Sequence, residues 1–241
     1  MADIPYLLRH RGERLGQHPD QERWSIVPSL VKLIQQAIRE QPLDVVVQPK
    51  DFLRIALIFE GSLALLAFLV GWLLGINPLQ HILFEWSALG WGLLGTAPLL
   101  VFFFFSYRFP TGALARIKSF LVQMLGPPLA ACRGYQLALL AGMVGFSEEL
   151  LFRGTLQPWL GSLWGSSLGL LASSALFGLA HFITPLYALL AGLTGVYLGL
   201  CLDIGGERNL AIPIIIHAVY DFIAFVVVAR TFRRDHRTSL G

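Results

Sequence analysis

Charged residues are scarce in this chain. Only 14% of its 241 residues are Asp, Glu, Lys or Arg, whereas 55% are hydrophobic; an ordinary soluble domain has about 25% charged residues. The net charge of +3 does not mark a nucleic-acid surface, because the basic residues gather near the start, in the segment 108–118 and after position 230, as in loops that flank membrane spans. The composition therefore excludes a soluble domain and predicts an all-α polytopic membrane protein without a nucleic-acid partner.

Cysteine is scarce in this chain, which excludes a disulfide framework. The two cysteines, Cys132 and Cys201, stand in no CxxC or CxxH spacing of a metal site, and we interpret both as structural. The HExxH helix of zinc proteases is missing as well. A catalytic metal would therefore need ligands from separate parts of the chain.

Residues 1–50 lack an apolar run long enough to cross a bilayer. Their start, Met-Ala-Asp-Ile-Pro, also lacks the basic region and apolar core of a signal peptide. We expect residues 1–50 to form a cytoplasmic N-terminal arm. Within it, apolar residues recur at helical spacing between positions 26 and 38, which predicts an amphipathic helix on the membrane surface or on the bundle.

Long apolar runs fill the rest of the chain, and we assign residues 51–241 to a single transmembrane domain. About six of these runs are expected to span the membrane. They cover residues 55–74, 86–105, 135–159, 166–183, 186–202 and 211–229. The positive-inside rule then places both termini in the cytoplasm. Gly126-Pro127-Pro128 precedes the third run and predicts an interfacial segment with a turn, because proline breaks a straight helix.

The third run contains the sequence GFSEELLFRG, residues 145–154, which sets two carboxylates and an arginine in an apolar helix. Ionisable groups at membrane depth are costly and are default candidates for function. Glu149 and Arg153 are four residues apart, in the favourable order for an ion pair. Glu148 lies about 100° around the helix from Glu149, so it lacks a local partner and is a candidate for proton exchange near neutral pH. An ion pair that only fixes helix packing is the alternative.

Two further polar pairs occur in later runs. Phe177 and His181 share one helical face, and so do His217 and Asp221. A single histidine in an apolar helix is more often a hydrogen-bonded packing residue than a catalyst. Polar sites in three separate spans, however, all need polar partners, and this favours one shared, hydrated cavity.

Glu60 lies in the first apolar run. It could be a second functional carboxylate or a group near the membrane interface. We interpret it as an interfacial group, because no other polar residue is spaced to join it within that helix.

A cavity of this composition could hydrolyse a peptide bond. A carboxylate and an imidazole that converge on one water can deprotonate it, and a second histidine with a polar neighbour can stabilise the oxyanion of a tetrahedral intermediate. Zinc is the alternative, because Glu148, His181 and His217 could supply three ligands with an open fourth position. Arg153 would then place a positive charge beside the cation, so we expect a site without a cofactor.

The ordered set of motifs resembles a known family. EExxxR at residues 148–153, FxxxH at 177–181 and HxxxD at 217–221, on successive hydrophobic helices, resemble the CPBP family, the group of CAAX prenyl endopeptidases and bacteriocin-processing proteins also called Abi. The resemblance covers residues 134–230, which would form the catalytic core. It implies an intramembrane glutamic endopeptidase, in a bacterial plasma membrane or a thylakoid, that acts in lipid on a membrane-associated peptide or protein.

The same resemblance implies roles for the site residues. Glu148 would be the general base that activates water with His181, Glu149 would be held by Arg153, and Phe177 would pack near the site. His217 and Asp221 would line the oxyanion side. The prenyl proteases commonly have Asn at the last position, and an ionised Asp221 would repel an oxyanion. Asp221 would therefore either stay protonated or orient His217.

Two other functions are compatible with the pattern. A non-catalytic membrane factor of the same fold could act in bacteriocin self-immunity or in the assembly of other membrane proteins, and would have a membrane-protein partner. A proton-coupled carrier could use the Glu and His residues as a relay. A carrier predicts polar groups at several depths and internal repeats, and neither is evident in the sequence.

Overall fold

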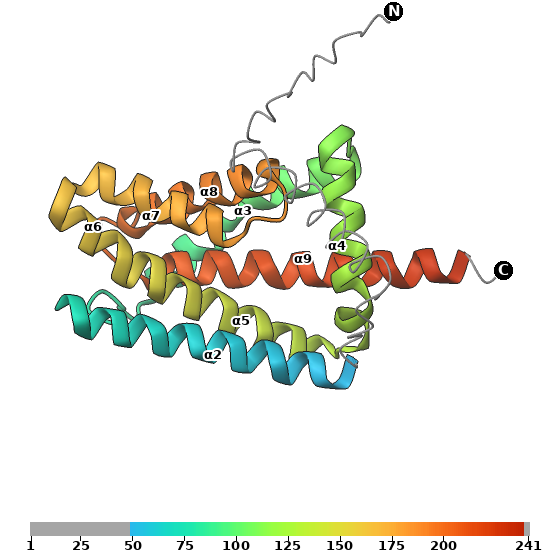
Figure 1. Cartoon of the computed structure of the whole chain (residues 1–241), viewed down its shortest axis with the longest axis horizontal. Coiled ribbons are helices and arrows are strands. Elements are labelled where there is room, and N and C mark those ends of the chain that lie inside the picture. Colours follow the sequence, from blue (N-terminus) through green and yellow to red (C-terminus); the bar gives the residue numbers. More distant parts are fainter. Residues whose placement is uncertain (1–48, 239–241) are drawn as a thin grey trace, which may run out of the picture. The chain divides into compact units, whose positions relative to one another are not determined.

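The computed structural model describes residues 49–238, which are helical and contain no strand (Figure 1). This confirms the all-α fold class. The predicted N-terminal arm with its amphipathic helix at residues 26–38 lies outside the described residues. The helices are α2 (Pro49–Leu74), α3 (Trp86–Arg108), α4 (Gly112–Ala131), α5 (Gly134–Leu151), α6 (Gln157–Trp164), α7 (Ser166–Ala180), α8 (Pro185–Leu200) and α9 (Ala211–Thr238), with a π-helical turn η1 (Phe152–Leu156) and a 3-10 turn η2 (Cys201–Asp203).

Four of the described helices are long and apolar enough to cross a membrane. They cover Asp51–Leu74, Trp86–Arg108, Pro185–Asp203 and Ala211–Arg237, and correspond to the first, second, fifth and sixth predicted spans. The protein is therefore an integral membrane protein. Helix α5 has 18 residues and α7 has 15, fewer than the approximately 20 residues that cross a bilayer core. The count of six spans stays a prediction.

Helix α5 lies between α2 and α9 and contacts both (Figure 1). The contact with α9 is close because α5 has a glycine at position 145. A Cβ atom on Gly145 would lie 2.8 Å from the backbone nitrogen of Ala218 and 3.0 Å from the carbonyl oxygen of Ile214. Both distances are shorter than an ordinary packing contact, so a larger residue at this position would push the two helices apart.

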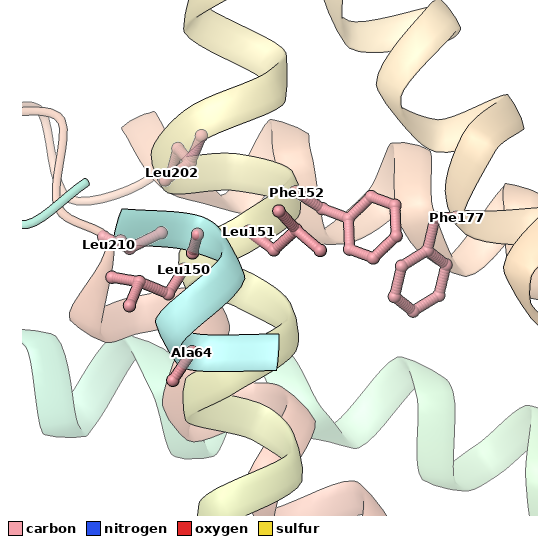
Figure 2. Packing of buried hydrophobic residues seen from close by; sticks show 8 residues of the cluster. Ala64, Leu150, Leu151, Phe152, Phe177, Leu202 and Leu210 are labelled. Carbon is pink, nitrogen blue, oxygen red and sulfur yellow. The ribbon is translucent and has the colours of Figure 1, made fainter. Parts of the chain in front are cut away.

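A buried cluster of apolar side chains joins these helices to α7 (Figure 2). It takes Ala64 from α2, Leu150 and Leu151 from α5, and Phe177 from α7. The rings of Phe152 and Phe177 meet edge to face with centroids 5.0 Å apart, a favourable arrangement for two aromatic rings. The cluster fixes the end of α5, where the two adjacent carboxylates lie, relative to α7.

The third predicted span is helical but is not one regular helix. Helix α5 ends at Leu151, the next five residues form the π turn η1, and α6 follows directly. The buried Thr155 hydroxyl donates to the carbonyl oxygen of Leu150 at 3.0 Å. Turns of this kind often occur at functional sites, and this one includes Arg153.

The turn predicted at Gly126-Pro127-Pro128 is not present, so that prediction was wrong. Helix α4 continues through both prolines to Ala131. Each proline lacks the N–H group that would bond to the carbonyl four residues earlier, so the local sequence disfavours this course. Gly126 also packs directly against Phe232 of α9, since a Cβ atom there would lie 2.7 Å from the Cβ of Phe232. Tertiary contact with α9 thus supports a helix that the local sequence disfavours.

Candidate active site

Glu149 is the centre of a buried polar cluster. Its Oε1 atom accepts a hydrogen bond from Nη1 of Arg153 at 2.8 Å and lies 2.9 Å from Nδ1 of His217. Because the same carboxylate oxygen already accepts from Arg153, the Nδ1–H group of His217 is the donor in the second contact. Arg153 also donates from Nη2 to the carbonyl oxygen of Gly195 at 2.9 Å. One buried ion pair therefore links α5 to α8 and α9.

Glu148 faces a different set of partners. Its Oε2 atom lies 3.6 Å from Nε2 of His181 and 3.8 Å from Nε2 of His217. Both distances exceed a direct hydrogen bond of up to about 3.2 Å, and such separations suit a water that contacts both groups. Within residues 49–238, this buried oxygen makes no direct hydrogen bond. Its lone pairs are therefore available to water or substrate.

His181 presents one ring nitrogen to this carboxylate. It follows directly after α7, and its Nδ1 atom lies 2.9 Å from the carbonyl oxygen of Phe177. A carbonyl can only accept, so Nδ1 carries the proton, and in the neutral ring Nε2 has a free lone pair directed toward Glu148. The side chain of His181 is 27% exposed, which makes this edge of the cluster accessible.

Asp221 completes the cluster from α9. Its Oδ2 atom lies 3.6 Å from Nε2 of His217. The imidazole of His217 thus has Glu149 at one nitrogen, and Glu148 and Asp221 near the other. The structure brings together all six residues that the sequence analysis selected, from α5, η1, α9 and the residue after α7.

A family model described as Rce1-like, type II CAAX prenyl endopeptidase, matches residues 132–223. This match supports the resemblance to the CPBP family, and we call residues 132–223 the CPBP segment. The CPBP segment runs from Cys132, directly after α4, to Ile223 within α9 and includes all six residues, whereas α2, α3 and α4 lie outside it. Neither a curated protein nor a solved structure matches the chain.

Phe177 forms an apolar wall of the cluster in the CPBP segment. Its ring centroid lies 4.4 Å from that of His181 and 6.0 Å from that of His217. The guanidinium carbon of Arg153 lies 4.5 Å from the same ring centroid, within the range of a cation–π interaction. Phe177 is 3% exposed, so it separates Arg153 from water and fixes the ring of His181.

Glu60 is the polar residue that the sequence analysis misplaced. It is not an interfacial group but a buried one, 7% exposed, and its Oε2 atom accepts a hydrogen bond from the hydroxyl of Ser147 at 2.6 Å. Ser147 lies 87 residues away in the sequence, on α5, directly before Glu148. Spacing within the first span therefore contained no signal for this contact.

A metal site is not apparent in the described residues. Among residues 49–238, no group of three or more His, Cys, Asp or Glu side chains is arranged to hold a metal ion. The zinc alternative would use Glu148, His181 and His217. The contact of His217 with Glu149 uses Nδ1 and leaves Nε2 for a metal, whereas Arg153, bonded to the same carboxylate, would place a positive charge nearby.

Proposed function

We propose that the protein is an intramembrane endopeptidase of the CPBP type, in which Glu148 and His181 activate a water for attack on a peptide bond. One observation carries the proposal. A buried carboxylate oxygen without a direct partner faces the unprotonated ring nitrogen of a histidine at 3.6 Å. A water between these groups would donate one hydrogen bond to each, which orients its oxygen toward a carbonyl carbon.

The reaction can be written with these groups alone. The water oxygen attacks the carbonyl carbon of the scissile bond while Glu148 takes one proton, and the carbonyl oxygen becomes an oxyanion. Collapse of this tetrahedral intermediate breaks the C–N bond, and Glu148 returns the proton to the departing amine. One water is consumed, and the carboxylate of Glu148 is regenerated. His181 holds the water through Nε2 and keeps its own proton on Nδ1.

His217 and Asp221 form the oxyanion side of the proposed site. The contact with Glu149 anchors the ring of His217 at Nδ1, so a protonated Nε2 would donate to the oxyanion. Asp221 lies on the same helix, 3.6 Å from Nε2. This position supports a role for Asp221 in orienting the imidazole, as carboxylates do for other functional histidines.

The substrate in this proposal is a membrane-associated peptide or protein, and lipid is the surrounding medium. The four long apolar helices and the family of the CPBP segment support it. Basic residues lie before and at the start of α2, after α3 and at the end of α9, whereas residues 75–85 before α3 contain no Lys or Arg; this supports an orientation with both termini in the cytoplasm. A bacterial plasma membrane or a thylakoid is the proposed location, and no cofactor is needed.

Purified protein in lipid nanodiscs, incubated with a library of membrane-associated peptides, tests the proposal. Wild type, Glu148→Gln and His181→Ala are compared with and without a chelator, and Glu85→Gln is the control because Glu85 is exposed. We expect cleavage by wild type and by the control, loss of about 10²-fold or more in the other two variants, and no effect of the chelator.

Each departure has a defined meaning. Full activity of Glu148→Gln would contradict water activation by this residue. Loss of cleavage with chelator, restored by zinc, would replace the glutamate mechanism with a metal-dependent one. Cleavage of no peptide by wild type would favour the non-catalytic membrane factor.

A further inference from the structure

Glu60 is a buried carboxyl group that the proposed reaction does not use. It lies on α2, outside the CPBP segment, and its side chain points to α5 rather than to lipid. Burial of a carboxyl group is costly unless polar partners compensate it. Its partner is the hydroxyl of Ser147, at 2.6 Å, which is within the range of about 2.5–2.7 Å for a charge-assisted O–H···O bond.

The hydrogen bond of Ser147 differs from those of three other helical serines in this protein. Ser62, Ser162 and Ser173 each donate to a carbonyl oxygen three residues earlier in their own helix, at 2.6 to 3.1 Å. The corresponding carbonyl for Ser147 is that of Val144, at the longer distance of 3.3 Å. The single hydroxyl proton of Ser147 is thus directed across the helix interface to α2.

This interhelical bond ends next to the proposed general base. Ser147 is fully buried and is followed directly by Glu148. The carboxyl group of Glu60 also interacts electrostatically with Glu148, His181 and His217. Glu60 therefore belongs to the same polar cluster as the six residues selected from the sequence.

We infer that Glu60 is a positioning residue of the active site: its hydrogen bond with Ser147 fixes the turn of α5 that directs Glu148 toward His181. The site then depends on α2, and the CPBP segment alone does not complete it. The expected effect on kcat rests on the proposed function. The expected effect on the placement of the Glu148 carboxyl group does not.

A double-mutant cycle tests the kinetic consequence. The variants are Glu60→Ala, Ser147→Ala, the double variant and Glu60→Gln, whose amide oxygen can still accept from the serine hydroxyl. We expect each alanine variant to lower kcat by about tenfold with little change in KM, since small displacements of a catalytic group are costly. The kcat of the double variant should be no lower than that of either single variant, because each single substitution already removes the Glu60–Ser147 hydrogen bond. Glu60→Gln should recover most of the activity.

A second pair in the protein provides a matched control. Glu85 accepts a hydrogen bond from Ser87 at 2.9 Å, but both residues are exposed. Glu85→Ala and Ser87→Ala should therefore leave kcat unchanged. Ser62→Ala removes a hydroxyl from α2 itself and should also have no effect, since this hydroxyl bonds only within its helix.

A measurement without substrate separates this inference from the proposed function. In protein labelled with ¹³C-glutamate, the carboxyl NMR signal of Glu148 is assigned by its loss in Glu148→Gln. We expect Glu60→Ala and Ser147→Ala to shift this signal, and Glu85→Ala to leave it in place. A shifted signal in a protein that cleaves no peptide would uphold the positioning role and reject the protease. An unshifted signal, or alanine variants with wild-type or strictly additive kinetics, would overturn the positioning role.

Discussion

Replacing Gly145 by alanine tests whether the close contact between α5 and α9 holds the site together. The added Cβ atom would lie 2.8 Å from the backbone nitrogen of Ala218 and 3.0 Å from the carbonyl oxygen of Ile214. Both neighbours are backbone atoms, so neither can rotate out of the way. The helices must therefore move apart, or the substituted helix must shift along its partner.

The size of this movement follows from the contact distances. Separation from 2.8 Å to an ordinary contact of 3.4 Å requires about 0.6 Å, which a close-packed interior does not absorb. The hydrogen bond between Glu149 Oε1 and His217 Nδ1, now 2.9 Å, crosses the same interface and would lengthen beyond about 3.2 Å. Overpacking of this kind costs about 1–3 kcal/mol, and displacements near 1 Å can lower rates about 10²-fold. We expect kcat to fall by about ten- to a hundredfold.

Gly142→Ala is the matched control on the same helix. A Cβ atom at position 142 meets no atom within 4 Å, and alanine favours a helix over glycine by up to about 1 kcal/mol. We expect wild-type cleavage and an equal or higher Tm. Peptide cleavage in nanodiscs and thermal unfolding in detergent are measured for both variants.

Two results would refute the reasoning. Wild-type cleavage by Gly145→Ala would show that the contact of α5 with α9 does not set the geometry of the site. Equal losses in Gly145→Ala and Gly142→Ala would show that α5 responds to any added methyl group, whatever its neighbours.

Three other substitutions test separate parts of the cluster. Arg153→Met leaves Glu149 buried without its cation, and we expect a loss of about 3–5 kcal/mol in unfolding free energy, measured by thermal or denaturant unfolding. Asp221→Asn removes the carboxylate that is proposed to orient His217, and we expect kcat to fall by about tenfold in the cleavage assay. Asn209→Ala removes two hydrogen bonds with Leu83 in the chain before α3 and a third with the backbone N–H of Ala211 at the start of α9, and we expect a cost of about 1–3 kcal/mol, measured by Tm.

Each of these expectations has a control or a contradicting result. Arg208→Met breaks a partly exposed ion pair with Asp203 and should lower the unfolding free energy by no more than about 1 kcal/mol. If Arg153→Met lowered it by the same small amount, burial of the Glu149–Arg153 pair would not explain its contribution. An unchanged or higher kcat for Asp221→Asn would contradict the orienting role of Asp221. An unchanged Tm for Asn209→Ala would show that these hydrogen bonds are replaced by water.

The sequence predicted the parts of the site that depend on helical spacing. Glu149 and Arg153 form the ion pair expected from a separation of four residues, and His181 contacts Phe177 as their shared face implied. The sequence also predicted that His217 lies near the third predicted span. The reason was more general: a polar group without a partner is costly in an apolar medium.

Contacts between different helices could not be predicted from spacing within one helix. Glu60 was misplaced because its partner Ser147 lies on another helix, and no periodicity relates the two positions. The helix through Pro127 and Pro128 was missed for the same reason, since its support comes from packing of Gly126 against α9. The π turn after Leu151 has no sequence pattern that distinguishes it from a continued α-helix.

The position of His217 and Asp221 on α9 has a consequence for biosynthesis. Ribosomes synthesise a chain from its N-terminus, so there is a stage at which α2, α5 and α7 have left the ribosome and α9 has not. A nascent chain at that stage has Glu148 and His181 but lacks the imidazole that anchors to Glu149 and faces the oxyanion. The proposed enzyme thus becomes competent only when its last described helix inserts, and unfinished copies at the insertion machinery are inert.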